Sequence, residues 1–479
     1  MQQGPPELKG KKYPAKSHAL KVKQHFLTKR PEFSNDKQAA FLIAGSNLNL
    51  YPYCDQTAPL RQNRYFHYLT GVEQISGAFV LFELLKEKLT LYLPEIDEDD
   101  VMWSGLPLSL KEAKEQFDVD ETKYVNELEK DLNKLTSEDK TTVFTTDTDE
   151  YSTQSFASLV LAKDNDFFYA LDESRLIKDD YELSLMRHAS KITDNSHLAV
   201  MSALPIEKNE THIHAEFLYH SIRQGSKFQS YDPICCSGPN CGTLHYVKND
   251  DSMAGKESVL IDAGAEWKCY ASDVTRCFPI NGEWTKEHLE IYTAVLDMQT
   301  QVMEKIKPGV AWEDLHFLAH RVLIDHFLKL GIFKNGTKEE IFKSKVSGWF
   351  LPHGLGHLLG MDTHDVGGYP NYEDPDPLLR YLRLRRKLQA GMVVTDEPGI
   401  YFSPFLIEHA LKNPEQKKYI DEEVMEKYMY VGGVRIEDDI LVTEEGYENL
   451  TGITSDPVEI SRIVKKGLAR GKEGFHVIV

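Results

Sequence analysis

The sequence has 479 residues, of which 41% are hydrophobic and 27% are charged, a balance that excludes a disordered or fibrous chain. No apolar run approaches the roughly 18 residues that a membrane-spanning helix requires, so we expect no membrane partner. The formal charge of −20 disfavours nucleic acid and anionic membrane surfaces as partners.

The N-terminal residues 1–30 are rich in Lys but lack the apolar core of a secretory signal peptide. The six cysteines show neither disulfide nor zinc spacing, which favours reduced thiols. We therefore expect a cytoplasmic protein. A mitochondrial presequence is the alternative, and the use of Lys rather than Arg disfavours it.

Residues 1–175 are expected to form an N-terminal domain of mixed α/β structure. Short apolar runs predict strands at 40–44, 77–83 and 88–93. Polar stretches predict helices around 110–117 and 124–135. The acidic run 95–100 is either a ligand cluster or a solvated loop, and isolated charge runs favour the loop.

Residues 176–479 are expected to form one catalytic domain, because a pattern of two helices followed by strands occurs twice. The first copy predicts helices at 180–203 and 211–224, then strands between 231 and 280. The second copy predicts helices at 285–307 and 311–330, then strands between 346 and 442. Such a duplication suggests two sheets around a shared cleft.

A predicted hairpin carries the first pair of candidate site residues, Asp262 and Asp273. If its turn is centred between Trp267 and Lys268, the two aspartates oppose each other directly, with Cβ atoms roughly 4.5–5.5 Å apart. Two carboxylates held so close favour a bound cation or a shared proton. The alternative is a pair of polar hairpin residues facing water.

A glycine-rich segment carries three candidate histidines, His353, His357 and His364. The glycines argue against a helix, which excludes the helical two-histidine zinc motif. Glycine also allows a close backbone approach that turns a neighbouring side chain into a cleft. Neutral imidazole is a common metal ligand, so we expect at least one ligand here.

Two further carboxylates, Glu397 and Glu437, lie at or beside strand-like runs in the second copy of the pattern. Arg435 shares a strand face with Glu437 by the period of two, and we expect it to orient that carboxylate. Oxygen-rich ligands with one imidazole favour Mn²⁺, Co²⁺ or Fe²⁺ over a thiolate-type zinc site. Carboxylates also bridge pairs of cations that activate water.

The segments LIDAGAEWKCYASDVTR, PHGLGHLLGMDTHDVGGYP, TDEPGIYF and GVRIEDDILVT together resemble the prolidase and aminopeptidase P branch of the pita-bread metallopeptidases. The likeness is greatest to fungal Xaa-Pro aminopeptidases of the prolidase-like type. RQNRYFHYLTG and IDEDDVMWSG are similar to creatinase-type N-terminal segments. The resemblance implies an α+β protein, with a creatinase-type α/β domain followed by a pita-bread catalytic domain.

The family implies hydrolysis of the bond before a proline at the second position of a peptide, by a hydroxide that bridges two metal ions. The implied ligands of two Mn²⁺ ions, with Co²⁺, Fe²⁺ or Zn²⁺ as alternatives, are Asp262, Asp273, His357, Glu397 and Glu437. Asp273 and Glu437 would bridge the ions.

His364 and His353 are the implied catalytic residues, and His364 would stabilise the substrate or intermediate. The implied substrate-binding residues are Tyr231, His245, Arg383 and Arg435. Relatives usually carry Val where this chain has Asp396, which puts the tuning of metal affinity in question.

A homodimer is also implied by the resemblance. A strict Xaa-Pro dipeptidase is the alternative activity. A non-catalytic pita-bread binding protein is a remote alternative, because such relatives lack the ligand set.

Overall fold

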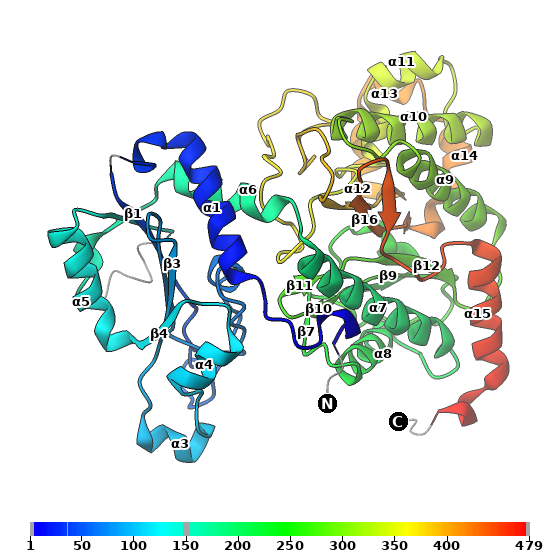
Figure 1. Ribbon diagram of the computed structural model, residues 1–479. Coiled ribbons are helices and arrows are strands. Elements are labelled where there is room, and N and C mark those ends of the chain that lie inside the picture. Colours follow the sequence, from blue (N-terminus) through cyan, green and yellow to red (C-terminus); the bar gives the residue numbers. More distant parts are fainter. Residues whose placement is uncertain (1–3, 36, 147–153, 476–479) are drawn as a thin grey trace. The chain divides into compact units, whose positions relative to one another are not determined.

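The computed structural model describes residues 4–35, 37–146 and 154–475 (Figure 1). These residues divide into two compact units, Pro5–Leu176 and the part from Ile177 onward, which also includes Gly4. None of the described helices combines the length and apolar character that a membrane crossing requires.

The unit Pro5–Leu176 is built on a six-stranded mixed sheet with the order β4-β3-β2-β1-β5-β6. Its strands are β1 (Ala39–Ala44), β2 (Phe79–Glu83), β3 (Lys88–Leu93), β4 (Glu121–Tyr124), β5 (Thr142–Thr145) and β6 (Val160–Ala162). Its helices are α1 (Ala15–Lys29), α2 (Arg64–Tyr68), α3 (Glu98–Ser104), α4 (Leu110–Gln116), α5 (Leu128–Asn133) and α6 (Asn165–Leu176).

Helices cover both faces of this sheet because consecutive residues of β1 point to opposite sides. Phe41 packs against Phe26 of α1 and Phe167 of α6. Leu42 belongs to the opposite cluster, which contains Leu128 of α5. The predicted strands are confirmed, and the acidic run ends in the exposed helix α3 instead of remaining a loop.

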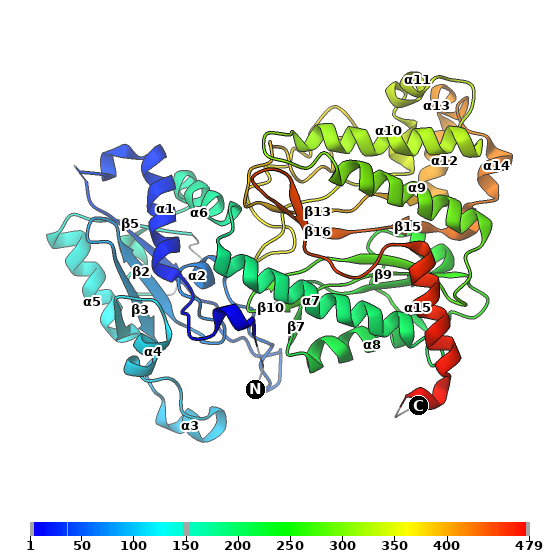
Figure 2. The same ribbon diagram turned by 45° about the vertical axis from the view of Figure 1, so that its right-hand side comes forward.

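The unit from Ile177 onward contains the two predicted helix pairs. The first pair is α7 (Asp180–Ser202) and α8 (Glu210–Arg223), and the second is α9 (Lys286–Met303) and α10 (Trp312–Leu330). The strands lie between the two pairs (Figure 2). The further helices are α11 (Lys338–Lys343), α12 (Pro404–Lys412), α13 (Pro414–Lys417), α14 (Glu422–Glu426) and α15 (Pro457–Arg470).

The strands of the first copy are β7 (Phe228–Gln229), β8 (Ile234–Ser237), β9 (Ser258–Asp262), β10 (Ala265–Trp267), β11 (Tyr270–Ala271) and β12 (Thr275–Pro279). Those of the second copy are β13 (Val393–Asp396), β14 (Gly399–Tyr401), β15 (Gly433–Arg435), β16 (Asp438–Val442) and β17 (Tyr447–Asn449). They form the sheets β12-β9-β8, β13-β16-β17, β11-β10-β7 and β14-β15. A bridge between Thr275 and Glu437 joins the two copies.

The second copy differs from the prediction between 346 and 442. Residues 351–392 form turns and loops, and three short helices, α12 to α14, separate β14 from β15. The first of these helices begins at a Ser-Pro pair, a start signal that outweighs the apolar character of the segment. Helix α9 also ends at Met303, before the Lys-Pro-Gly sequence predicted to stop it.

Candidate active site

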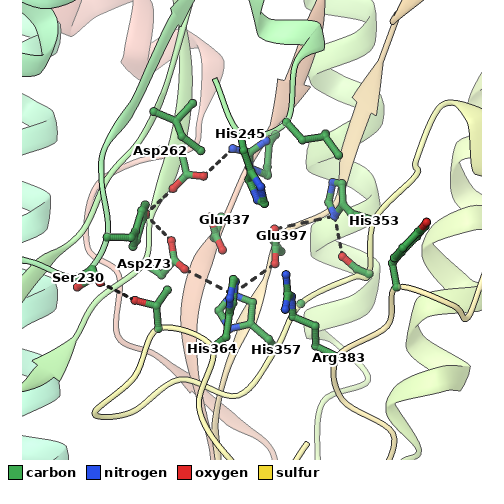
Figure 3. A pocket seen from close by; sticks show the side chains of 18 of the residues that line it. Ser230, His245, Asp262, Asp273, His353, His357, His364, Arg383, Glu397 and Glu437 are labelled. Carbon is green, nitrogen blue, oxygen red and sulfur yellow. Dashed lines mark hydrogen bonds and ion pairs between the residues drawn. The ribbon is translucent and has the colours of Figure 1, made fainter. Parts of the chain in front are cut away.

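A cavity of about 800 Å³ opens in the unit from Ile177 onward. Every side chain proposed from the sequence lines it: Tyr231, His245, Asp262, Asp273, His353, His357, His364, Arg383, Glu397, Arg435 and Glu437. The first copy of the fold contributes Tyr231, His245 and the two aspartates, and the second contributes the rest (Figure 3). Packing of the two copies therefore assembles the cavity.

The predicted register of the aspartate hairpin is wrong by one residue on each strand. Asp262 opposes Thr275, and Trp267 pairs with Tyr270, so the turn is centred between Lys268 and Cys269. Both turn residues have positive φ, as a two-residue type I′ turn requires. Neither is the Asn, Asp or Gly that usually marks such a turn, so the sequence did not reveal its position.

The two aspartates still share one face of the hairpin, as diagonal rather than opposed neighbours. Gly264 lies opposite Asp273 in this register. A Cβ on Gly264 would lie 1.7 Å from the carbonyl oxygen of Ser272, so the close approach of the two strands requires glycine at this position. The hydroxyl of Tyr231, which has one hydrogen to donate, lies in hydrogen-bonding contact with both Asp262 and Asp273. The phenol therefore holds the two carboxylates together.

The glycine-rich segment lies along β13. The amide of Thr395 donates to the carbonyl oxygen of His357 over 2.9 Å, and the amide of Glu397 donates to that of Leu355. A Cβ on Gly356 would lie 2.0 Å from the carbonyl oxygen of Thr395, so this close pairing requires glycine. The pairing brings His357 and Glu397 to the same wall of the cavity.

The imidazole of His357 offers its Nε2 atom to the carboxylates. Its Nδ1 atom lies 2.9 Å from the carbonyl oxygen of Leu358 and so carries the hydrogen. The Nε2 atom lies 3.4 Å from Asp273 and 3.6 Å from Glu397. Burial lowers the pKa of His357 to about 4, which keeps the ring neutral.

Like charges crowd the cavity floor. Burial raises the pKa of Asp273, Glu397 and Glu437, and each is raised further by a neighbouring carboxylate. Asp273, His357 and Glu437 each offer a ligand atom, and these atoms lie within 4.8 Å of one another. Buried carboxylates and one neutral imidazole therefore fit hard divalent cations of the Mn²⁺ type.

Arg435 contacts Asp262 directly and reaches Glu437, the carboxylate that it is expected to orient, through Thr275. Its Nη2 atom lies 2.6 Å from Asp262, and its Nε donates to the hydroxyl of Thr275 over 3.1 Å. That hydroxyl donates to Glu437 over 2.7 Å. This role of Thr275 is not evident from the sequence, although the residue lies in the motif LIDAGAEWKCYASDVTR.

Tyr401 is a second site residue that sequence reasoning missed. Its hydroxyl accepts a hydrogen bond from Arg435 over 2.8 Å and lies 2.9 Å from Nε2 of His353. Nδ1 of His353 lies 2.7 Å from the carbonyl oxygen of Gly354 and carries the hydrogen, so Tyr401 donates to Nε2. A chain of contacts thus runs from Asp262 through Arg435 and Tyr401 to His353.

His364 and Arg383 face the cavity from the loops that follow the glycine-rich segment (Figure 3). The ring of His364 lies perpendicular to that of His357, with centroids 4.4 Å apart. Burial, with the nearby His357 and Arg383, lowers the pKa of His364 to about 3. A buried ion pair of 2.8 Å between Lys178 and Asp365 anchors the loop beside His364.

Asp396 does not line the cavity. The side chain is fully buried, and neither carboxylate oxygen has a hydrogen-bond partner among the described residues. Burial, with the nearby Asp438 and Glu397, raises its pKa well above the usual range. The departure from the usual Val therefore lies outside the cavity lining, next to Glu397 in the sequence.

Comparison with known proteins agrees with this geometry. Residues 184–444 match the family described as "Metallopeptidase family M24", and residues 21–144 match "Aminopeptidase P, N-terminal domain". The chain belongs to metallopeptidase family M24. It is therefore a peptidase, and the predicted α+β fold with an N-terminal domain before a pita-bread domain is confirmed.

Several relatives span nearly the whole chain. An uncharacterised peptidase of Saccharomyces cerevisiae is 57% identical over 99% of this chain and 88% of its own length. A probable Xaa-Pro aminopeptidase of Colletotrichum graminicola is 46% identical over 96% of this chain and 98% of its own length.

Solved aminopeptidase P structures share the architecture of this chain. Aminopeptidase PepP of Pseudomonas aeruginosa has a TM-score of 0.77 and 27% identity, covering 96% of this chain and 99% of its own. Aminopeptidase P of E. coli, solved with the inhibitor Pro-Leu, has a TM-score of 0.75 and 30% identity, covering 93% and 99%. The resemblance stated from the sequence motifs is thus confirmed.

Proposed function

We propose that this peptidase removes the first residue of peptides that carry proline at the second position. The observation that carries the proposal is the convergence of Asp273, His357 and Glu437 on one floor of a cavity large enough for a short peptide. The 46% identity to probable Xaa-Pro aminopeptidases supports the choice of substrate. A strict Xaa-Pro dipeptidase is the alternative within the same chemistry.

The residues that would hold two divalent cations, Mn²⁺ in our proposal, are Asp262, Asp273, His357, Glu397 and Glu437. Asp273 and Glu437 are the candidates for shared ligands. When bound, such a pair supplies an activated water and polarises the scissile carbonyl group. Arg435 donates to three protein groups, so we assign it the support of Asp262 instead of direct substrate binding.

Neutral side chains around the cations suit the handling of a peptide bond. His364 is uncharged at neutral pH and can donate an N–H group to the carbonyl oxygen before proline. His353 and His245 line the opposite wall, where the residues after the scissile bond would lie.

In the described part of the chain no carboxylate pairs with Arg383, which leaves its guanidinium for a substrate carboxylate.

The proposal is tested by turnover of an Xaa-Pro dipeptide and an Xaa-Pro-Xaa tripeptide with added Mn²⁺. We expect release of the first residue from the tripeptide and no cleavage of a matched peptide with Ala at the second position. Equal cleavage of the Ala peptide would contradict proline specificity. A strong preference for the dipeptide would assign the protein as a dipeptidase.

We also propose that the protein is a cytoplasmic homodimer. The six cysteines are unpaired thiols and five are buried, which suits a reducing compartment. The homodimer rests on the family resemblance. Light scattering of the purified protein, and localisation of a tagged chain, test the two statements separately.

A further inference from the structure

The loop that follows β8 presents His245 to the cavity. Leu244, His245 and Val247 line the cavity wall, and His245 is exposed on its cavity side. Residues 238–257 between β8 and β9 contain a short 3-10 helix and no strand. An exposed loop of this kind needs specific contacts to hold one side chain in place.

One buried carboxylate, that of Glu210 at the start of α8, ties this loop at both ends. Its Oε1 atom accepts from the amide of Ser237 over 2.9 Å, from the hydroxyl of Ser237 over 2.7 Å and from Asn240 over 3.0 Å. Its Oε2 atom accepts from the amide of Asp251 over 3.0 Å. Glu210 is completely buried and lies outside the cavity lining.

The middle of the loop reaches the same carboxylate through Tyr246. The Tyr246 hydroxyl donates to Oε2 of Glu210 over 2.8 Å and accepts from Asn240 over 3.2 Å. Tyr246 is the neighbour of His245, so the hydroxyl contact fixes the backbone directly beside the imidazole. Hydrogen bonds to an ionised acceptor are about twice as strong as neutral ones.

Charge compensation for Glu210 comes from the far end of the loop. Lys256 places its Nζ atom 3.6 Å from Oε1 of Glu210, 2.7 Å from Asp251 and 3.0 Å from the hydroxyl of Ser237. A buried carboxylate with several donors and a nearby cation is a satisfied polar network, which favours one conformation of the groups around it.

We propose that Glu210 and Tyr246 are positioning residues for His245, holding this side chain against the part of the substrate beyond the scissile bond. The inference rests on the proposed function, because it assigns His245 to substrate contact. A displacement of about 1 Å in such a group costs on the order of a hundredfold in rate.

The test removes the hydroxyl group of Tyr246 that donates to Glu210. We expect Tyr246→Phe to lower kcat/KM on an Xaa-Pro-Xaa tripeptide by about tenfold, with bound metal unchanged, because the backbone beside His245 loses its anchor. Glu210→Gln, which removes the charge and replaces one acceptor oxygen with an NH₂ donor, should change activity in the same direction. Tyr428→Phe is the matched control, because Tyr428 donates to Glu290 over the same 2.8 Å outside the cavity.

Two readouts separate positioning from a general structural role. In a His245→Ala background, Tyr246→Phe should cause no further loss, whereas additive losses would overturn the proposal. By hydrogen exchange, residues 243–248 should exchange faster in Tyr246→Phe while β9 stays protected, and unchanged exchange in the loop would also overturn it. If wild-type protein fails to cleave Xaa-Pro peptides, the proposed function fails while the exchange result still decides the anchor.

Discussion

At the scale of single residues, two proposed ligands are oriented before any cation binds. The carbonyl oxygen of Leu358 holds the Nδ1 hydrogen of His357, and the hydroxyl of Thr275 donates to Glu437. Such outer contacts decide which ligand atom faces the metal. The Nε2 atom of His357 and the second carboxylate oxygen of Glu437 are therefore left to face the cavity, and the two side chains need not change rotamer to reach a cation.

We expect Asp273→Asn to abolish metal binding and activity together. The substitution keeps the shape of the side chain but removes a charge that lies 3.4 Å from Nε2 of His357 and would serve both cations. Metal content measured by elemental analysis should fall to the background. Asp232→Asn is the control, since Asp232 lines the same cavity outside the ligand set. An active Asp273→Asn protein with two bound metals would reject the bridging role.

His364→Ala should keep both metals and lower kcat by about 10²–10⁴, the usual range for an acid–base or positioning group. The reason is that the ring of His364 packs perpendicular to that of His357. His364 does not belong to the group Asp273, His357 and Glu437, whose ligand atoms lie close together. Parallel measurement of metal content and kcat distinguishes the roles. If the metal content falls with the rate, His364 serves the metal site instead.

Arg383→Ala should raise KM for an Xaa-Pro dipeptide by about tenfold or more, equivalent to roughly 1.4 kcal/mol. Of the local arginines, Arg385 pairs with Glu313 and Asp374, while Arg383 lines the cavity. A dipeptide carboxylate needs a cationic partner there, whereas that of a tripeptide lies further out. Arg380→Ala, an exposed neighbour, is the control. Equal losses on both substrates would reject this anchor.

The candidate residues that line the cavity could be named from the sequence, but their mutual contacts could not. Asp262, His357 and Glu397 stand in motifs whose residue types suit metal binding. The roles of Thr275 and Tyr401 depend on strand register and on the packing of the two copies against each other. A Thr or Tyr residue in the sequence does not show that its hydroxyl supports a site until its neighbours in space are known.

At the scale of elements, helices were easier to predict than sheets because their ends carry local signals. Thr285 caps α9 through its side chain, and Gly331 ends α10 in a left-handed conformation. The hairpin turn at Lys268 and Cys269 carries no comparable signal. The course of the loops between 351 and 392 depends on tertiary contacts, of Gly356 with Thr395 of β13 and of Gly368 with the backbone of Arg383, for which no local sequence signal exists.

Arg276 of β12 connects the two copies, and its loss should be costly. The buried guanidinium pairs with Asp438 over 2.7 Å and donates to the carbonyl oxygens of Glu437 and Ile453. Arg276→Met leaves Asp438 as a buried, uncompensated charge, so we expect a loss of about 3–5 kcal/mol in the free energy of unfolding. Metal affinity should also fall, since the backbone of Glu437 loses a partner.

Chemical denaturation measures the loss in the free energy of unfolding of Arg276→Met, with Arg187→Met as the control variant. Arg187 forms an ion pair of the same 2.7 Å with Glu448, but both side chains are well exposed. An exposed pair contributes about 0–1 kcal/mol, so the control should be nearly neutral. Similar losses in the two variants would show that burial of the Arg276–Asp438 pair is not the cause of the loss.

At the scale of the whole molecule, no single copy of the duplicated pattern holds all five proposed ligands. Asp262 and Asp273 come from the first copy, and His357, Glu397 and Glu437 come from the second. The copies meet at the bridge between Thr275 and Glu437. Cation binding should therefore stabilise the packing of one copy against the other, because it links ligands from both.

The stabilisation by bound cations should depend on pH, because the proposed ligands are buried carboxyl groups. In the metal-free protein, burial raises the pKa of Asp273, Glu397 and Glu437 well above their usual range. Unfolded carboxyl groups titrate near pH 4, so the folded protein holds protons that the unfolded chain has released. The stabilisation that these protons provide is complete below about pH 4 and is lost as the pH rises through the folded pKa values.

Cations need the deprotonated carboxylates, so metal affinity should rise over the pH interval in which the metal-free protein loses stability. We expect the increase in Tm on adding Mn²⁺ to chelator-treated protein to be larger at pH 8 than at pH 5. His357 does not oppose this trend, because burial lowers its pKa to about 4 and leaves it neutral throughout. Taking the difference in Tm with and without Mn²⁺ at each pH removes the contribution to Tm from groups that titrate far from the cavity. An increase that is constant or shrinks with pH would show that the buried carboxylates do not bind the cation.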